Sequence, residues 1–151
     1  MTITIKEVRA WLDAEEPDYA AAANALGDAA QPVLLQLIQG GDPALASKAT
    51  YLASLLPGQA GALQALKAAH ATGAPLLKVA AASALRNLQA DAAGEMFDVL
   101  HADADAGVRK VALRSAVGLS APRVQQRLRQ LAQDDPAPFV RALAAQVADK
   151  Q

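Results

Sequence analysis

Residues 103–116 read DADAGVRKVALRSA, and residues 135–148 read DPAPFVRALAAQVA. The residues that coincide at a spacing of 32 include Asp103 and Asp135, Val108 and Val140, and Arg109 and Arg141. A phrase that recurs at a fixed step within one chain is the signature of structural repeats, each of which is one small unit of secondary structure. The chain is therefore expected to be built from units of about this length.

The same register continues towards the N-terminus. Leu or Val followed by a basic or small residue occurs at steps of 32, 31 and 32, as Leu45-Ala46, Leu77-Lys78, Val108-Arg109 and Val140-Arg141. Each of these pairs opens an alanine-rich segment, and alanine has the highest helix propensity. The predicted helices are 43–56, 75–89, 106–119 and 137–149, with 17–27 as a shortened first copy.

A second helical segment precedes each alanine-rich one. Stretches such as VLLQLI (33–38) and RLRQLA (127–132) place apolar residues at helical spacing. These first helices are predicted at 3–14, 29–39, 59–71, 91–102 and 122–133. One helix pair cannot bury its apolar face alone, whereas a stack of pairs can. The prediction is an all-α protein, an α-solenoid of about five antiparallel helix pairs in a single domain, with repeats at 1–28, 29–57, 58–89, 90–120 and 121–151.

The repeat resembles the HEAT family, in particular the short bacterial HEAT-like repeats of the phycocyanobilin-lyase type. The resemblance rests on a helix such as LLQLI, a turn with Asp, and Val-Arg opening an alanine-rich helix. It implies a right-handed, armadillo-type superhelix with the second helix of each pair on the concave face. The second and third copies depart from the pattern. They carry Gly40 and Thr72 in place of the Asp, and Ala46 and Lys78 in place of the Arg.

Composition favours a soluble, foldable chain. Of 151 residues, 53% are hydrophobic and 19% are charged, which is typical of a globular domain rather than a disordered one. The absence of cysteine excludes disulfides and thiolate metal sites. The first residues lack the long apolar run of a secretory signal, and no stretch has the length of a membrane span. A cytoplasmic location without membrane association is expected.

Charge is unevenly distributed although the net charge is only −1. Acidic residues dominate between 10 and 30, and basic residues dominate between 105 and 130. The basic region 109–129 is either a solvated face, a surface for an acidic protein, or a contact for nucleic-acid phosphates. The small positive excess and the scarcity of aromatic residues disfavour nucleic acid.

Motifs for catalysis are absent, so no enzyme activity, cofactor or metal site is expected. His70 and His101 lie 31 residues apart. They could form a metal or pH-sensitive site, but the favoured interpretation is that each caps its own helix, since no carboxylate stands at a suitable repeat position. Trp11 is interpreted as part of the first layer's packing, and Phe97 and Phe139 as core residues.

Two sets of residues are singled out by their register. Each helix pair is one layer of the predicted stack. Asp103, Arg109, Asp135 and Arg141 are predicted to form a ladder, in which each arginine binds the turn or the aspartate of an adjacent layer. Counted from Leu45, Leu77, Val108 and Val140 as position one, the third, seventh and tenth positions of the second helices are predicted to face outward on the concave side. They are Ser47, Tyr51 and Ser54; Val79, Ser83 and Arg86; Lys110 and Arg114; Ala142 and Gln146.

Tyr51, Arg86 and Arg114 are the predicted anchors of that concave face, because Tyr and Arg dominate binding hot spots. The expected function is a non-enzymatic scaffold that binds a protein or peptide, including an acidic one. The alternatives are a lyase-like or chaperone-like component that assists attachment of a prosthetic group, and nucleic-acid binding through 109–129. The oligomeric state is left open.

Overall fold

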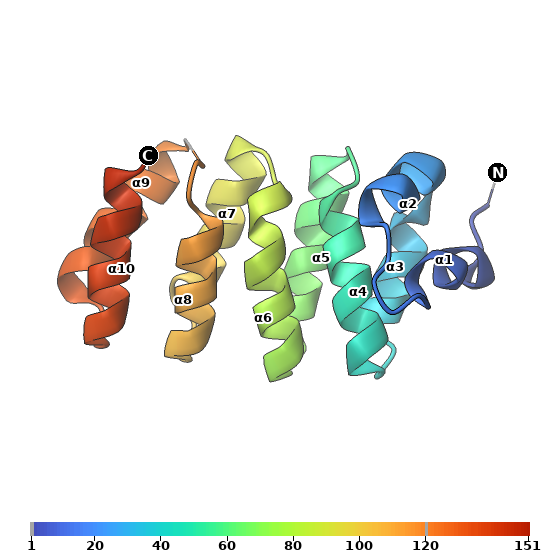
Figure 1. Ribbon diagram of the computed structural model, residues 1–151, viewed down its shortest axis with the longest axis horizontal. Helices are drawn as coiled ribbons and strands as arrows, with labels where there is room; N and C mark the ends of the chain where they lie inside the picture. The colour runs from blue at the N-terminus through green and yellow to red at the C-terminus, as the bar shows by residue number, and fades with distance from the viewer. Residues whose placement is uncertain (1, 120) are drawn as a thin grey trace.

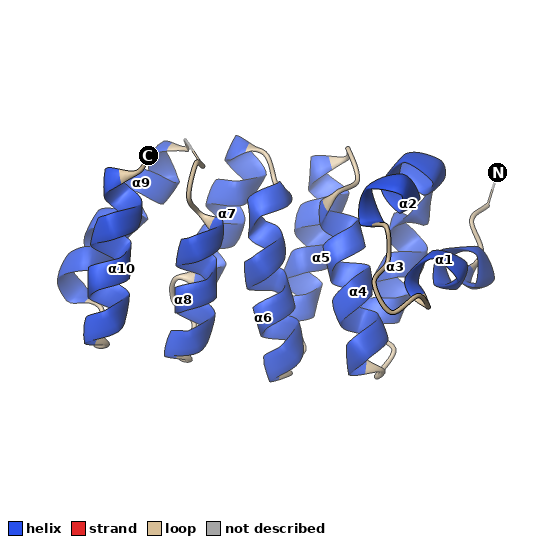
Figure 2. Cartoon of the chain, viewed as in Figure 1, coloured by secondary structure: helices blue, strands red, loops and turns tan. Residues whose placement is uncertain are grey.

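The structure is a computed structural model that describes residues 2–119 and 121–151. Helices account for all of the regular secondary structure in those two ranges, and none of their residues lies in a strand (Figure 2). The α-helices are α1 (Ile5–Leu12), α2 (Tyr19–Leu26), α3 (Gln31–Ile38), α4 (Pro43–Ser54), α5 (Gln59–Ala71), α6 (Pro75–Ala84), α7 (Ala90–Leu100), α8 (Ala106–Ser115), α9 (Pro122–Asp134) and α10 (Pro138–Asp149). Two 3-10 helices, η1 (Gly27–Ala30) and η2 (Leu85–Asn87), continue the chain after α2 and α6.

The helices lie in two rows that follow the order of the chain (Figure 1). In the front row α4 packs on α6, α6 on α8 and α8 on α10; in the row behind, α3 packs on α5, α5 on α7 and α7 on α9. Consecutive helices join the rows, as in α3 with α4 and α9 with α10. The N- and C-termini consequently lie at opposite ends of the molecule (Figure 1).

The predicted helices agree with the observed ones to within a few residues, and the largest difference is at the end of α8. The sequence predicts a helix to Leu119, whereas α8 ends at Ser115. Gly118 has a φ of 85°, a left-handed backbone conformation that stops a helix and that glycine adopts without steric cost. The predicted helix 75–89 also ends early, because α6 stops at Ala84 and η2 extends the helical segment only to Asn87.

The starts of the second helices follow from local sequence. The side chains of Asp18, Asp42 and Asp105 accept hydrogen bonds from backbone N–H groups in the first turns of α2, α4 and α8. Proline occupies the first turn of the second helices α4, α6 and α10, and also of the first helices α3 and α9, where its missing N–H costs nothing. These caps hold each second helix at a defined starting point after its turn.

The core is built from alanine and leucine and runs through all layers as one cluster. Phe97 is its largest fully buried side chain, as expected. The expectation for Phe139 is wrong, because this ring is 52% exposed near the start of α10. Phe139 precedes the buried Val140, so it points to the other side of the helix. Trp11 packs against the core and is partly exposed.

No helix in the described part of the chain combines the length and the hydropathy that crossing a lipid bilayer would require.

Candidate binding surface

The outer side of the front row carries the residues predicted to bind. We call the solvent-facing side of α4, α6, η2, α8 and α10 the second-helix surface. Arg86, Arg114 and Gln146 are exposed on it, and Ser47, Tyr51, Ser83 and Lys110 are half-buried. The structure thus brings the predicted residues onto one row of adjacent helices.

Three of these residues, Ser47, Tyr51 and Ser83, line one depression between α4 and α6. Its volume is about 290 Å³, and its lining is Tyr19, Ser47, Tyr51, Leu76, Val79, Ala80 and Ser83. The depression exists because serine and alanine side chains are too small to fill this space, and larger apolar side chains form its walls. We call it the α4–α6 depression.

Two tyrosines from different helices form one side of the α4–α6 depression. The rings of Tyr19 on α2 and Tyr51 on α4 have centroids 4.9 Å apart and are tilted by 59°. Burial and the neighbouring Tyr51 raise the pKa of the Tyr19 hydroxyl, so Tyr19 is neutral at physiological pH. The pair fixes the orientation of Tyr51, which is thereby preorganised rather than free to rotate.

Apolar side chains are exposed on the other side of the depression. Leu76 is 49% exposed and Val79 is 39% exposed, both on α6. Their exposure follows from the helical period, because the adjacent Leu77 is buried in the core and takes the inward position. Position counting identified Val79 but missed Leu76 and Tyr19. The available signal for Leu76 was the Leu-Leu pair, of which only one residue can face inward.

Ser54 was predicted to face outward, and this is wrong. It is 1% exposed at the end of α4, where its hydroxyl donates to the carbonyl of Tyr51 at 2.6 Å and accepts from Asn87 of η2 at 3.0 Å. The tenth position of α4 therefore belongs to the contact between layers.

The three central helices of the front row carry basic side chains and no acidic ones. Within α4, α6 and α8 the charged residues are Lys48, Lys78, Arg109, Lys110 and Arg114. Lys48 donates to the carbonyls of Leu12 and Ala14 beyond the end of α1. Lys78 and Arg109 pair with aspartates between helices. Lys110 and Arg114 make no ion pair with the described residues and are left on the second-helix surface.

Arg86 lies between the α4–α6 depression and α8. Its Nε donates to the carbonyl of Ser83 at 3.0 Å, and an NH2 group donates to the hydroxyl of Ser115 on α8 at 3.3 Å. Because both acceptors are neutral, the positive charge of Arg86 is not compensated by these contacts. Arg86, Lys110 and Arg114 together give the middle of this surface a positive character.

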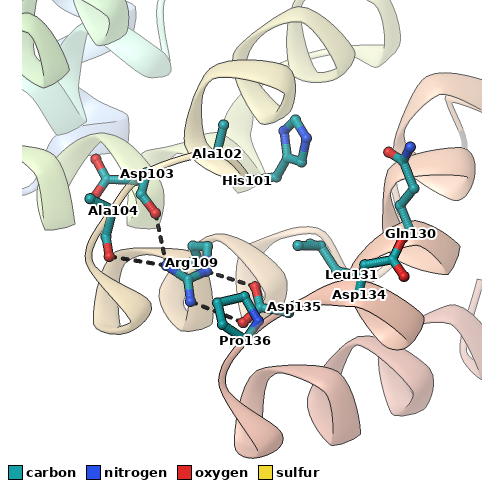
Figure 3. Close-up of a pocket in the computed structure, with 10 residues that line it drawn as sticks. All are labelled: His101, Ala102, Asp103, Ala104, Arg109, Gln130, Leu131, Asp134, Asp135 and Pro136. Atoms are coloured by element: carbon teal, nitrogen blue, oxygen red, sulfur yellow. Dashed lines mark hydrogen bonds and ion pairs between the residues drawn. The ribbon is translucent and has the colours of Figure 1, made fainter.

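The predicted ladder connects the turns at the opposite end of the same helices. Arg109 on α8 donates from Nε and NH2 to the two carboxylate oxygens of Asp135, at 2.7 and 2.9 Å (Figure 3). Its third nitrogen, NH1, donates to the carbonyls of Asp103 and Ala104 in its own turn. The side chains of Arg109 and Asp135 are 8% and 1% exposed. This rung is a buried, bidentate ion pair between the fourth and fifth layers.

A second rung, one layer earlier, uses different residues. Lys78 Nζ lies 3.0 Å from Oδ1 of Asp103, and His70 Nε2 lies 2.7 Å from Oδ2. Lys78 was interpreted as a departure from the repeat, but it occupies the position of Arg109 and makes the corresponding contact. His70 was expected to cap its own helix; instead it binds a carboxylate of the next turn.

Both aspartates hold their negative charge firmly. Burial pushes the pKa of Asp103 upward, but the N–H of Asp105 and the contacts with Lys78 and His70 outweigh it, so the pKa is lowered. Burial acts in the same direction on Asp135, and Arg109 and the N–H of Ala137 lower the pKa of that carboxyl. The two carboxyl groups, of Asp103 and Asp135, are therefore ionised at neutral pH.

Arg141 and His101 occupy the ladder positions of the last layers differently. Arg141 donates from NH1 to the carbonyl of Asp135 at 2.6 Å, in its own turn, and pairs with no carboxylate of a further layer. His101 does cap its helix as expected, with Nδ1 at 2.7 Å from the carbonyl of Asp98, and its ring points away from Asp135 (Figure 3).

An open pocket of about 510 Å³ lies beside the Arg109–Asp135 rung (Figure 3). Its lining includes His101, Gln130 and Asp134 as well as the rung itself. Four of the five guanidinium N–H groups of Arg109 are already bonded, so a single N–H of NH2 is left for a ligand. The described residues contain no cluster of three metal-binding side chains, and the pocket is explained as a gap between two turns.

Three of the six basic side chains between 109 and 129 are held in ion pairs, whereas Lys110, Arg114 and Arg129 make none with the described residues. Arg109 is paired with Asp135, and Arg123 and Arg127 on α9 both bind Asp98 on α7. Asp98 keeps a lowered pKa because these contacts outweigh the opposing effect of its burial. Phosphate binding along α9 would have to displace these internal contacts, which weakens the case for a nucleic-acid site there.

Comparison with protein-family models, with curated proteins and with solved structures found no match for this chain.

Proposed function

We propose that the chain is a right-handed, HEAT-type solenoid that acts as a non-enzymatic scaffold and binds a segment of another protein on its second-helix surface. The single observation that supports binding there most directly is the α4–α6 depression, with its preorganised tyrosine pair and its exposed Leu76 and Val79. The solenoid assignment is supported by the repeat register and by the two rows of helices that follow chain order.

The fold does not depend on an apolar residue at the position of Val79. At the third position of the second helices the chain also uses Ser47 and Ala142, so a small residue serves packing equally well. Exposing a leucine and a valine instead of alanines leaves apolar area in water without any gain for the folded state. A partner that covers these two side chains removes apolar surface from water, which stabilises the complex by about 25 cal/mol per Å².

The first test is a binding experiment on full-length protein. Partners are captured from an extract of the source cells, and the affinity of a purified partner is measured for Tyr51→Ala and Val79→Asp. We expect each variant to weaken binding by about 1 kcal/mol or more, because a hot-spot anchor is lost or a charge enters an apolar site. The matched control is Ile5→Asp, which alters an exposed aliphatic residue of α1, away from the surface.

Capture of a partner does not by itself support the proposal. The proposal is supported if substitutions in α4 and α6 weaken the affinity for that partner. If Ile5→Asp is as damaging as Val79→Asp, or if Tyr51→Ala and Val79→Asp leave the affinity unchanged, the second-helix surface is not the binding site. Melting temperatures are measured in parallel. Val79→Asp and Ile5→Asp should melt close to the unsubstituted protein because both side chains are exposed, whereas Tyr51→Ala should melt lower because Tyr51 packs against the core and Tyr19.

A further inference from the structure

We propose that the segment bound on the second-helix surface is an acidic peptide with one large apolar side chain, which enters the α4–α6 depression while carboxylates about three residues away meet Arg86, Lys110 and Arg114. This inference rests on the proposed function and adds the chemistry of the partner. It combines an apolar hollow with an uncompensated positive field on the helix beside it.

The apolar part of the site accepts an aliphatic or aromatic side chain of moderate size. The depression has a volume of about 290 Å³ and is walled by Tyr51, Leu76 and Val79, with Ala80 among its lining residues. Ser47 and Ser83 contribute the only other side chains of α4 and α6 in the lining. No charged side chain lines it, so a charged group entering it would lose hydration without gaining a partner.

The basic part of the site lies one helix further along the row. Lys110 on α8 has the register of Val79 on α6, and Arg114 has the register of Ser83, so both point to the same side as the depression. Arg86 bridges the two helices through its bond to Ser115. Since α4, α6 and α8 contain no acidic residue, nothing within these helices offsets the three charges.

The distance between the apolar and the basic part of the site determines how many residues separate the apolar side chain of the peptide from its carboxylates. Neighbouring packed helices lie about 8–10 Å apart, and an extended chain advances about 3.3 Å per residue. A peptide crossing the helices therefore places a carboxylate about three residues from its apolar anchor when it reaches α8. Carboxylates here would meet guanidinium and ammonium groups that are already held on helices, which suits charge-assisted hydrogen bonds.

A peptide fits this site better than single-stranded nucleic acid. Binding of bases needs open aromatic faces for stacking, but Tyr19 and Tyr51 pack on each other at 59°. The remaining walls are aliphatic. Three free cations also provide a weaker phosphate track than nucleic-acid grooves usually carry.

The experiment selects random dodecamer peptides by phage display against the full-length protein and measures the affinity of synthetic copies of the enriched sequences. We expect enrichment of a large apolar residue with Asp or Glu about three residues away. Replacing those acidic residues by Asn or Gln should weaken binding at least tenfold at low salt, and added salt should weaken the parent peptide more than its amide form. This arm changes only the peptide, so it does not depend on how any variant folds.

Affinities of the same peptides for variants of the protein show which part of the surface they contact. Lys110→Glu and Arg114→Glu should each weaken binding about fivefold to tenfold, whereas Arg129→Glu, a matched charge reversal at an exposed position of α9, should change it less than twofold. Leu76→Asp should weaken binding of acidic and amide peptides alike. A dodecamer of thymidine, measured alongside, should bind more weakly than the peptides.

The outcomes separate the two proposals. Enriched peptides that respond to Leu76→Asp but lack acidic residues overturn the acidic-partner inference and leave the binding surface in place. Failure to enrich any peptide that responds to Leu76→Asp, Lys110→Glu or Arg114→Glu overturns both. Tighter binding of the thymidine oligomer, lost in Arg114→Glu, overturns the peptide in favour of nucleic acid.

Discussion

At the scale of single residues, the two rungs show how different side chains fill one structural role. Arg109 satisfies both oxygens of Asp135 alone, whereas Asp103 receives Lys78 on one oxygen and His70 on the other. The remaining donor in each case is a backbone N–H two residues later, from Asp105 or Ala137. A lysine has one donor centre and no fork, so a histidine completes the contact that an arginine makes unaided.

Removing the buried rung should cost much more stability than removing an exposed ion pair. Arg109→Ala leaves the carboxylate of Asp135 buried without its partner, and we expect a loss of about 3 kcal/mol, or roughly 6–12 °C in melting temperature. Arg123→Ala should cost less than about 1 kcal/mol, because Arg123 is exposed and Arg127 still binds Asp98. Thermal melts followed by circular dichroism compare the two; equal losses would mean that the rung is not a stabilising element.

The rungs also predict how stability depends on pH. The folded state lowers the pKa of Asp103 and Asp135, so the unfolded state binds protons more readily as acid is added. The stabilisation is fully present above the ordinary carboxyl pKa of about 4 and is lost as pH falls through that value towards the lowered ones. Asp103→Asn with Asp135→Asn should flatten the slope of unfolding free energy between about pH 5 and pH 3.

Glu16→Gln serves as the control for this titration, because Glu16 is exposed before α2 and makes no hydrogen bond or ion pair within the described residues. Urea unfolding at each pH supplies the free energies. A slope in the double variant as steep as that of Glu16→Gln would show that other carboxyls carry the acid sensitivity.

At the scale of helices, the order and extent of the elements were predictable because the punctuation is local. Asp42 with Pro43 acts within a few residues of its own position, and the stop signal Gly118 is equally local, although the predicted helix 106–119 runs through it. Which side of each helix faces water was less predictable. In α6 alanine and leucine occur on all sides, so the pattern does not say which leucine faces water. Leu76 is assigned to the solvent side only because the structure places Leu77 in the core. Tyr19 joins the site through contact between α2 and α4, which no local pattern encodes.

Substitution of the two phenylalanines tests which of the rings is buried in the core and which is exposed to solvent. Phe97→Ala opens a cavity within α7 and its neighbours, and we expect a loss of about 3–5 kcal/mol. Phe139→Ala removes a half-exposed ring at the start of α10 and should change stability by less than about 1 kcal/mol. Denaturant titrations give both values. A loss at Phe139 comparable to that at Phe97 would place this ring in a contact that the structure does not show.

At the scale of the whole molecule, neighbouring layers are joined at several points along the helices. Besides the rungs, the carboxylate of Asp28 accepts from the N–H of Gly58, and the side-chain oxygen of Gln59 accepts from the N–H of Gln89 one layer later. Both bonds join helices of the row behind: Asp28, in η1 before α3, binds the residue before α5, and Gln59, at the start of α5, binds the residue before α7. Each layer is thus held by its immediate neighbours.

This arrangement predicts a gradient of protection along the chain. Helices α6 and α8 each pack between two helices of the front row, and α4 packs between α2 and α6, whereas α1 and α10 close the ends. Hydrogen–deuterium exchange read by mass spectrometry should be slowest in α4 to α8 and faster in α1 and α10, since the end layers can open without disturbing the middle. Uniform protection from α1 to α10 would mean that the molecule opens only as a whole.

The spacing of the contacts also bears on how the chain folds and how it responds to force. Within the described part of the chain, side-chain hydrogen bonds between different helices join residues from 22 to 36 positions apart, as in Gln31 with Ala53 and Lys48 with Leu12. No such bond closes a loop much longer than one repeat, so folding needs only short loop closures and can proceed rapidly from any layer. Pulled by its two ends, the protein would extend in successive steps, each releasing one helix pair, and would thus act as a short molecular spring.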